Sequence, residues 1–293
     1  MARILELNCY PIKGCAGTRL SSSLVTPAGL EHDRSFMVIS EPGVFRSQRR
    51  DPALARIRPE MSPDGDRLTL RSPGHEPFGH EVDYRSAARE VSLFGQPYRG
   101  IDQGDPVAVW LGQVLGVPSR LVRVPTDHAR ITDGQTPGTC GYADSSPIHM
   151  VSTSSLILLN ERIARASTEQ TPTPGPVKHD PDTGRTSIPV PTERFRPNLV
   201  IEGWDEPHTE DRCRRIEVGD VEFAYAKLAI RCAVTMVDQV TGGKVGPEPL
   251  RTLATYRRSS GGVAFGTKFA VLRDGKLTVG DELTVHEWAP TDL

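Results

Sequence analysis

The sequence has no long apolar run and no excess of charge of one sign. No stretch approaches the ~20 apolar residues that a membrane-spanning helix needs, and the opening residues, MARILELNCYPIKG, lack the apolar core of a secretion signal. The 35 Lys and Arg against 37 Asp and Glu give a net charge of −2, which argues against nucleic acid or an anionic membrane surface as a partner. We therefore expect a cytoplasmic protein without a membrane span.

The motifs of common metal and nucleotide enzymes are also missing. The five cysteines are an odd number and widely spaced, with no Cys-x-x-Cys pair, which excludes a disulfide framework, a zinc ribbon and a self-contained iron–sulfur cluster. There is no His-Glu-x-x-His, Gly-x-Gly-x-x-Gly, P-loop or Gly-x-Ser-x-Gly motif. The zinc-protease, dinucleotide-binding, P-loop and serine-hydrolase classes are therefore unsupported.

What is present is a succession of short apolar runs. A chain of 293 residues forms one large domain or two modest ones. In the first hundred residues these runs alternate with Gly, Pro and Asp turns, which favours a small β-barrel or sandwich over βαβ units. Asp105–Leu115 has helical apolar spacing, with Asp105 as its N-cap and Gly116 at its end. We predict a mainly β fold with a few helices (α+β), divided near residue 120 into domains spanning 1–120 and 121–293.

The second half is predicted to contain a helix over 155–165 and then a loop insertion over about 166–188. The insertion is rich in Pro, Thr and charge, and has too few apolar side chains to offset the entropy cost of ordering it. After it we expect strands over residues 198–202, 215–218, 221–228 and 233–237, a short helix ending near 256, and strand pairs turning at 219–220, 274–275 and 280–281.

Among the candidate functional residues, Cys232 stands out because it follows Arg231 in the apolar segment AIRCAVTMVD. A guanidinium beside a thiol favours the thiolate, which is a nucleophile and a ligand for soft metals. A free cysteine in such a segment is more often a buried structural residue. From the residues alone, both interpretations stay open.

Several polar positions beside turns predict an anion site. Lys13 and Gly14 end the first strand, Arg34 begins another, and Ser145 and Ser146 precede an apolar run. Arg194 and Arg196 share one side of an extended segment because alternate residues of a strand share a face. Cations and hydroxyls that converge bind phosphate-like anions, although each charge taken singly is more often a solvated surface residue.

In combination, these segments make the chain resemble the MOSC family (molybdenum cofactor sulfurase C-terminal domain) in the form that carries an N-terminal MOSC β-barrel domain. The resemblance covers nearly the whole length. It rests on ordered motifs: YPIKG, GLEHDRSFMV, QRRDPAL, the tetrapeptide Asp-Ser-Ser-Pro at 144–147, RFRPNLVI, RCAVTxVDxxTG, EPLxTL and VGDEL.

The resemblance implies two β-barrel domains, residues 1–120 and 121–293, that bind the pyranopterin molybdenum cofactor (molybdopterin). By position, Cys232 matches the metal ligand and, with Asp238, the expected catalytic residues. Gly14 stands where relatives often have Ser, and Lys268 replaces a polar or aromatic residue. The positions expected to bind the cofactor are Lys13, Gly14, Arg34, Ser145, Ser146, Arg196, Asn198, Ile230, Arg231 and Lys268.

The function implied is a molybdenum-dependent oxidoreductase that reduces N-hydroxylated or N-oxide small molecules. No four-cysteine pattern of a [2Fe–2S] domain is present, so the electrons are expected from a separate ferredoxin or cytochrome b5-type protein. The alternative is a binding module that carries the cofactor, or sulfur on Cys232, without substrate turnover.

Overall fold

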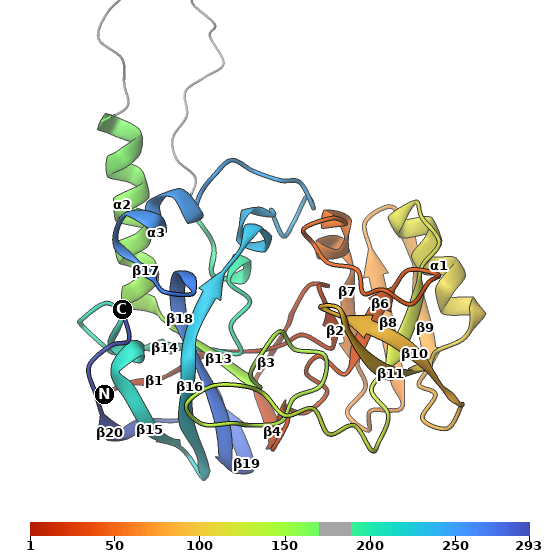
Figure 1. The fold of residues 1–293 in the computed structure, drawn as a ribbon, viewed down its shortest axis with the longest axis horizontal. Helices are drawn as coiled ribbons and strands as arrows, with labels where there is room; N and C mark the ends of the chain where they lie inside the picture. Colours follow the sequence, from red (N-terminus) through yellow and green to blue (C-terminus); the bar gives the residue numbers. More distant parts are fainter. Residues whose placement is uncertain (170–188) are drawn as a thin grey trace, which may run out of the picture.

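A computed structural model describes residues 1–169 and 189–293, and its largest element is a nine-stranded sheet (Figure 1). The sheet has the order β20-β15-β16-β18-β13-β14-β1-β3, and β17 pairs with β18. Its apolar side chains form the main core, which includes Leu7, Phe223 and Phe269. Its strands are β1 (Arg3–Cys9), β3 (Thr18–Leu20), β13 (Ile148–Ser152), β14 (Leu199–Glu202), β15 (Cys213–Val218), β16 (Val221–Arg231), β17 (Arg258–Ser259), β18 (Gly262–Arg273) and β20 (Leu283–Trp288).

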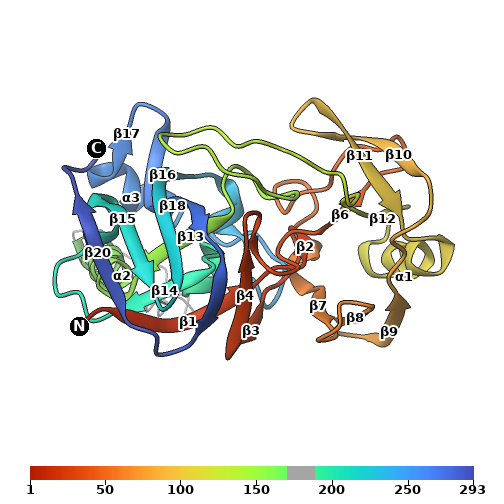
Figure 2. The same cartoon turned by 90° about the horizontal axis from the view of Figure 1, so that it is seen from below.

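The other half of the molecule contains a five-stranded sheet with the order β10-β11-β12-β6-β2, and a three-stranded meander β7-β8-β9. A further small sheet, β19-β4-β5, lies between the halves (Figure 2). These strands are β2 (Ile12–Lys13), β4 (Ser22–Thr26), β5 (Gly29–Leu30), β6 (Phe36–Ile39), β7 (Arg58–Met61), β8 (Arg67–Ser72), β9 (His75–Glu81), β10 (Ala88–Leu93), β11 (Gln96–Asp102), β12 (Arg120–Arg123) and β19 (Gly275–Thr278).

This composition confirms a mainly β fold with few helices. The helix α1 has the predicted bounds, Asp105–Leu115, but its N-cap is Gly104, and Asp105 is its first helical residue. Gly116 ends it in a left-handed conformation with φ 67°, which glycine adopts at little cost. The other helices are α2 (Thr153–Glu169) and α3 (Leu250–Tyr256). In the part of the chain that is described, no helix is long and apolar enough to cross a membrane.

Three expectations for the second half are corrected. The predicted insertion begins too early, because α2 continues through residues 166–169; residues 170–188 lie outside the described part. The segment 233–237 is not a strand, since Ala233–Met236 form a 3-10 helix, η4. The turn at Gly219-Asp220 does join β15 to β16, but β19 pairs with β4 and β20 with β15. The expected strand pairs at 274–275 and 280–281 are therefore wrong, because β19 and β20 form their hydrogen bonds with strands that are distant in sequence.

The first strand belongs to the sheet of the second half. β1 pairs antiparallel with β14, where Leu7 lies opposite Leu199, and with β3 on its other edge. In Figure 2 β1 runs along the large sheet. The chain then reaches the smaller half at β2, which pairs with β6, and returns to the large sheet at β3. Residues before and after position 120 therefore share one hydrophobic core. The division near residue 120 stays a prediction.

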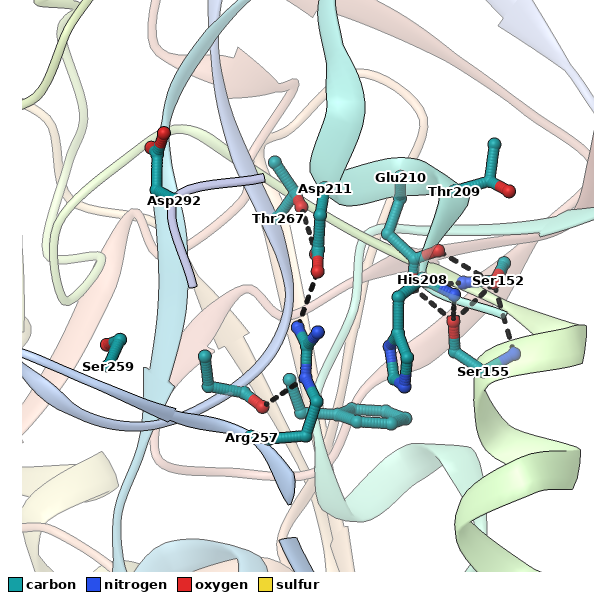
Figure 3. A network of polar contacts seen from close by, with 12 residues as sticks. Ser152, Ser155, His208, Thr209, Glu210, Asp211, Arg257, Ser259, Thr267 and Asp292 are labelled. Atoms are coloured by element: carbon teal, nitrogen blue, oxygen red, sulfur yellow. Dashed lines mark hydrogen bonds and ion pairs between the residues drawn. The ribbon is translucent and has the colours of Figure 1, made fainter. Parts of the chain in front are cut away.

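A buried polar network fixes the start of α2 to the large sheet (Figure 3). The Glu210 carboxylate accepts hydrogen bonds from the hydroxyls of Ser152 and Ser155, each at 2.8 Å. The next residue, Asp211, pairs with Arg257 at 2.6 Å and accepts a bond from Thr267 at 3.1 Å. Glu210, Asp211 and Arg257 are all buried, so the ion pair between Arg257 and Asp211 lies in the protein interior beside a second carboxylate.

We predict that Arg257→Met lowers the free energy of unfolding by roughly 3–5 kcal/mol, because it leaves the buried carboxylate of Asp211 without its cation. Urea unfolding at neutral pH measures the effect. The control is Arg251→Met, which removes an exposed arginine paired with Glu248 and is expected to cost less than about 1 kcal/mol. Equal losses in the two variants would contradict the assigned role of Arg257.

Candidate functional site

A cavity of about 300 Å³ lies where the two halves meet, and both halves line it. From the first half come the end of β2, the loop over residues 45–49 and the β10–β11 turn; from the second come the loop before β13, the loop before β14, and parts of β16 and β18. The structure brings together eleven of the predicted site residues on its wall: Lys13, Gly14, Arg34, Ser145, Ser146, Arg196, Asn198, Ile230, Arg231, Cys232 and Lys268.

Cys232 lies at the point where β16 ends and η4 begins. It is the one exposed cysteine; the other four are buried. Its carbonyl oxygen accepts hydrogen bonds from the backbone N–H and the hydroxyl of Thr235, both at 3.0 Å. The thiol is therefore held by ordered backbone and reaches the cavity. This accessibility disfavours the interpretation of Cys232 as a buried structural residue.

The two residues before Cys232 also line the cavity. Arg231 donates from Nη2 to the carbonyl oxygen of Phe195 at 2.7 Å, while its buried Nε has no partner in the protein. Burial lowers the pKa of Arg231 to about 10, against the opposing effect of Cys232. Ile230 keeps 41% of its surface exposed. The arginine therefore has hydrogen-bonding capacity that the chain itself leaves unused.

An aromatic ring separates two arginines of the site. The guanidinium carbons of Arg34 and Arg196 each lie 4.3 Å from the ring centroid of Tyr10, which is buried. Stacking of this kind is favourable because the ring face is electron-rich. Asp33 pairs with Arg34 at 2.5 Å, and Arg196 donates to the carbonyl oxygen of Cys15 at 2.5 Å. These contacts hold two like charges in fixed positions.

Both of these arginines have left-handed backbone conformations, with φ 50° at Arg34 and 57° at Arg196. Residues other than glycine adopt this region at a cost. Gly14 has φ 82°, and its carbonyl oxygen accepts a hydrogen bond from Gln48 at 2.7 Å. A serine at this position would need the same conformation, so glycine relieves backbone strain here.

On the opposite wall the Lys13 ammonium is buried and paired with Asp144. It also lies 4.8 Å from the ring centroid of Phe94. Burial lowers the pKa of Lys13, and Asp144 opposes that shift. Burial would raise the pKa of Asp144, but Lys13 and Lys268 outweigh it and hold that pKa well below its usual range. The Lys13–Asp144 pair therefore stays ionised.

The serines and Asn198 make different contacts. Lys268 donates from Nζ to the Ser145 hydroxyl at 2.5 Å, whereas the buried Ser146 hydroxyl has no partner in the protein. The Asn198 side chain accepts a bond from the backbone N–H of His149 and donates to the carbonyl oxygen of Asn8, both at 3.2 Å. Asn198 therefore joins β13 to β1, while Ser146 is free to bind a ligand.

Asp238 is not brought to the cavity wall. Its carboxylate caps the following turn, accepting bonds from the backbone N–H groups of Val240 at 2.9 Å and Thr241 at 2.7 Å. Its other oxygen lies 4.0 Å from Arg194. Nearby, the side-chain amides of Gln48 and Gln239 bond to each other across the two halves, at 3.1 and 3.0 Å. The placement of Asp238 supports a positioning role in this turn.

The cavity wall carries a strong excess of positive charge. Asp144 is the only carboxylate among its described lining residues, against eight Lys and Arg: Lys13, Arg34, Arg46, Arg49, Arg196, Lys227, Arg231 and Lys268.

These features fit an anionic cofactor that supplies its own metal-coordinating atoms. Residues 1–169 and 189–293 contain no group of three His, Cys, Asp or Glu side chains that could hold a metal ion. A metal at Cys232 would therefore need ligands from a cofactor. The unpartnered Ser146 hydroxyl and Arg231 Nε are donors of the kind that a phosphate accepts.

Sequence reasoning missed His149, which is buried in β13 and lines the cavity. Burial, together with Arg231 and Lys268, lowers the pKa of His149 well below its usual range, so it is neutral. Tyr10 and Phe94 were missed as well. A polar residue inside the apolar run PIHMVS was a usable signal for His149, whereas the contacts of the two aromatic rings depend on loops distant in sequence.

Comparisons with known proteins agree with the motifs. The chain is 32% identical over 295 residues to mitochondrial amidoxime reducing component 2 of Rattus norvegicus, covering 93% of this chain and 80% of that protein. It is 29% identical to mitochondrial amidoxime-reducing component 1 of Homo sapiens, covering 95% of this chain and 81% of that protein.

A second group of relatives is much longer. The chain is 31% identical to molybdenum cofactor sulfurase of Danio rerio over 91% of its own length, but it spans only 32% of that protein. Residues 1–118 match the family described as the MOSC N-terminal beta barrel domain, and residues 137–284 match the MOSC domain. The chain belongs to the MOSC family, in the form with both of these domains.

Proposed function

We propose that the protein is a molybdenum-cofactor oxidoreductase that reduces N-oxygenated small molecules. The observation that carries the proposal is an exposed thiol, Cys232, on the wall of a cavity rich in buried cations. A pyranopterin molybdenum cofactor has a phosphate and supplies both sulfur ligands and two-electron redox chemistry when it is bound. The chain offers a complementary set of groups: one soft ligand and several anion-binding donors.

In this proposal different residues of the cavity wall bind the metal and the phosphate of the cofactor. Cys232 coordinates the metal, and Arg231, whose Nε has no partner in the protein, lies beside it as a hydrogen-bond donor to the cofactor. Arg34 and Arg196, fixed by Tyr10, bind the phosphate together with the unpartnered hydroxyl of Ser146. Because these donors are already ordered in the protein, little conformational entropy is lost when the cofactor binds.

The reaction class follows from the relatives named for amidoxime reduction. Cleavage of an N–OH bond to N–H and water consumes two electrons and two protons. The electrons are proposed to come from a separate one-electron carrier of ferredoxin or cytochrome b5 type. The protein's part is to bind the substrate beside Cys232 and to position proton donors.

The relatives named as cofactor sulfurases favour a second candidate, a carrier of the cofactor or of sulfur. An exposed thiol next to Arg231 could also hold a persulfide, since a neighbouring cation stabilises its anionic form. Turnover of an amidoxime with a chemical one-electron donor favours the reductase. Transfer of labelled sulfur from Cys232 without such turnover favours the carrier.

Replacing the proposed metal ligand is the first test. In protein made by a host that synthesises the cofactor, Cys232→Ser is expected to remove amidoxime reduction and to change the molybdenum electron paramagnetic resonance signal, because a hard hydroxyl replaces a soft thiolate. The matched control, Cys140→Ala, changes a buried cysteine outside the cavity lining and should retain molybdenum and turnover. Full activity of Cys232→Ser would exclude Cys232 as the ligand.

The variants Ser146→Ala and Ser155→Ala should have opposite effects on stability and on cofactor content. Ser146→Ala removes a buried hydroxyl without a partner, so cofactor-free protein should be as stable as wild type or up to about 1–3 kcal/mol more stable, while retaining less cofactor. Ser155→Ala removes a donor to Glu210 and should lose about 1–3 kcal/mol without a specific loss of cofactor. Urea unfolding and molybdenum per folded chain measure both effects. A destabilised Ser146→Ala with normal cofactor content would contradict the assignment.

The role of Asp238 is tested by separating its charge from its hydrogen bonds. Asparagine can keep the acceptor that caps the turn, whereas alanine cannot. We expect Asp238→Asn to retain kcat within about twofold and Asp238→Ala to lose more, since the turn is then uncapped. If the carboxylate were a general acid or base, Asp238→Asn would lower kcat by about 100-fold or more.

A further inference from the structure

Three basic side chains lie side by side on the cavity wall, across three adjacent strands. Lys268 of β18 is opposite His149 of β13 on one edge and opposite Lys227 of β16 on the other. All three residues line the cavity. Like charges directly opposite each other in a sheet repel, so the row of Lys227 and Lys268 has a cost unless anions balance it.

The available carboxylates leave Lys268 unbalanced. Lys227 pairs with Asp133 at 2.5 Å, and Asp144 is paired with Lys13. No carboxylate in the described residues lies within ion-pair distance of Lys268, whose Nζ donates only to the Ser145 hydroxyl. Burial, together with the charges of Arg231, Lys227 and Arg34, lowers the pKa of Lys268 to about 8, although Asp144 opposes the shift. His149 adds a ring nitrogen but no charge.

The proposed cofactor does not remove this imbalance. Arg196 and Arg231 also have no carboxylate partner in the described part of the chain, whereas Arg34 has Asp33. In the proposed function the phosphate lies at Arg34, Arg196 and Ser146, and the anionic Cys232 sulfur lies beside Arg231. Neither of these anions is assigned to Lys268. The ammonium of Lys268, on the central strand of the basic row, therefore still lacks a counter-charge after the cofactor's phosphate has been assigned.

We propose that Lys268 and Ser145 form a subsite for a carboxylate of the substrate, so that this protein prefers N-hydroxylated compounds that carry an acid group. The inference rests on the proposed reductase function. The group recognised is an oxyanion, and the other possible source is the phosphate of the cofactor itself. Lys268 is a specificity-determining residue here, and the reaction at nitrogen does not depend on it.

The test compares benzamidoxime with 4-carboxybenzamidoxime, which differ only in the acid group. Cofactor-loaded wild type, Lys268→Gln and Lys268→Arg are assayed with reduced viologen as the one-electron donor, and molybdenum per chain is measured for each. The matched control is Lys244→Gln, an exposed lysine outside the cavity lining. Lys268→Arg keeps the positive charge and shows whether the strand tolerates substitution.

The wild type is expected to have a KM about 10- to 100-fold lower for the carboxylate, as one charge-assisted hydrogen bond in a partly buried site allows. Lys268→Gln should lose this preference, because its KM for 4-carboxybenzamidoxime rises relative to its KM for benzamidoxime, and Lys268→Arg should restore part of it. Equal KM values for the two amidoximes in wild type overturn the proposal. Loss of molybdenum in Lys268→Gln but not in Lys244→Gln also overturns it, because the oxyanion is then that of the cofactor.

If wild type reduces neither amidoxime, the proposed reductase function is wrong. The subsite is then tested separately, by measuring how tightly the carboxylate compound binds. Isothermal titration of 4-carboxybenzamidoxime into loaded wild type and Lys268→Gln then gives the answer. Binding that is at least tenfold tighter to wild type supports the subsite, and equal or absent binding overturns it.

Discussion

The concentration of positive charge at the junction of the two halves is the constraint on which the rest of the site depends. Cations brought this close repel one another, and the protein separates them in two ways. Asp33 and Asp144 neutralise one cation each, and the Tyr10 ring contacts two guanidiniums. A ligand bound in the cavity has to balance the remaining positive charge. The arrangement therefore selects anionic ligands before any specific contact is considered.

Backbone conformation holds these charges in place. Arg34, Arg196 and Gly14 all lie in the left-handed region, at three loops that reach the cavity from different elements. A strained arginine persists only where its surroundings favour it, and here ion pairs, stacking and carbonyl contacts do so. Rigid loops keep the donors oriented before a ligand arrives, which lowers the entropic cost of binding.

Local pattern predicted much of the fold, and the resemblance named most of the predicted residues that line the cavity. The bounds of α1 followed from its apolar spacing and terminal glycine, and the resemblance placed eleven residues that the structure finds around one cavity. What failed was non-local. The edges taken by β19 and β20 depend on β4 and β15, and no local turn signal encodes that choice. Asp238 was singled out by its motif, but its carboxylate is engaged by the turn that follows it. That Cys232 ligates a metal stays a prediction.

The position of β1 has a consequence for the way the chain is synthesised. Its main partner, β14, lies almost two hundred residues later, and both strands contribute to the largest core. On a ribosome that releases the chain from its N-terminus, the side chains of Ile4 and Leu7 stay without most of their neighbours until residue 202 has emerged. The loops that carry Lys13 and Arg34 follow directly on this strand. The anion-binding wall can therefore reach its final form only after residue 268, the last residue that lines the cavity, has emerged.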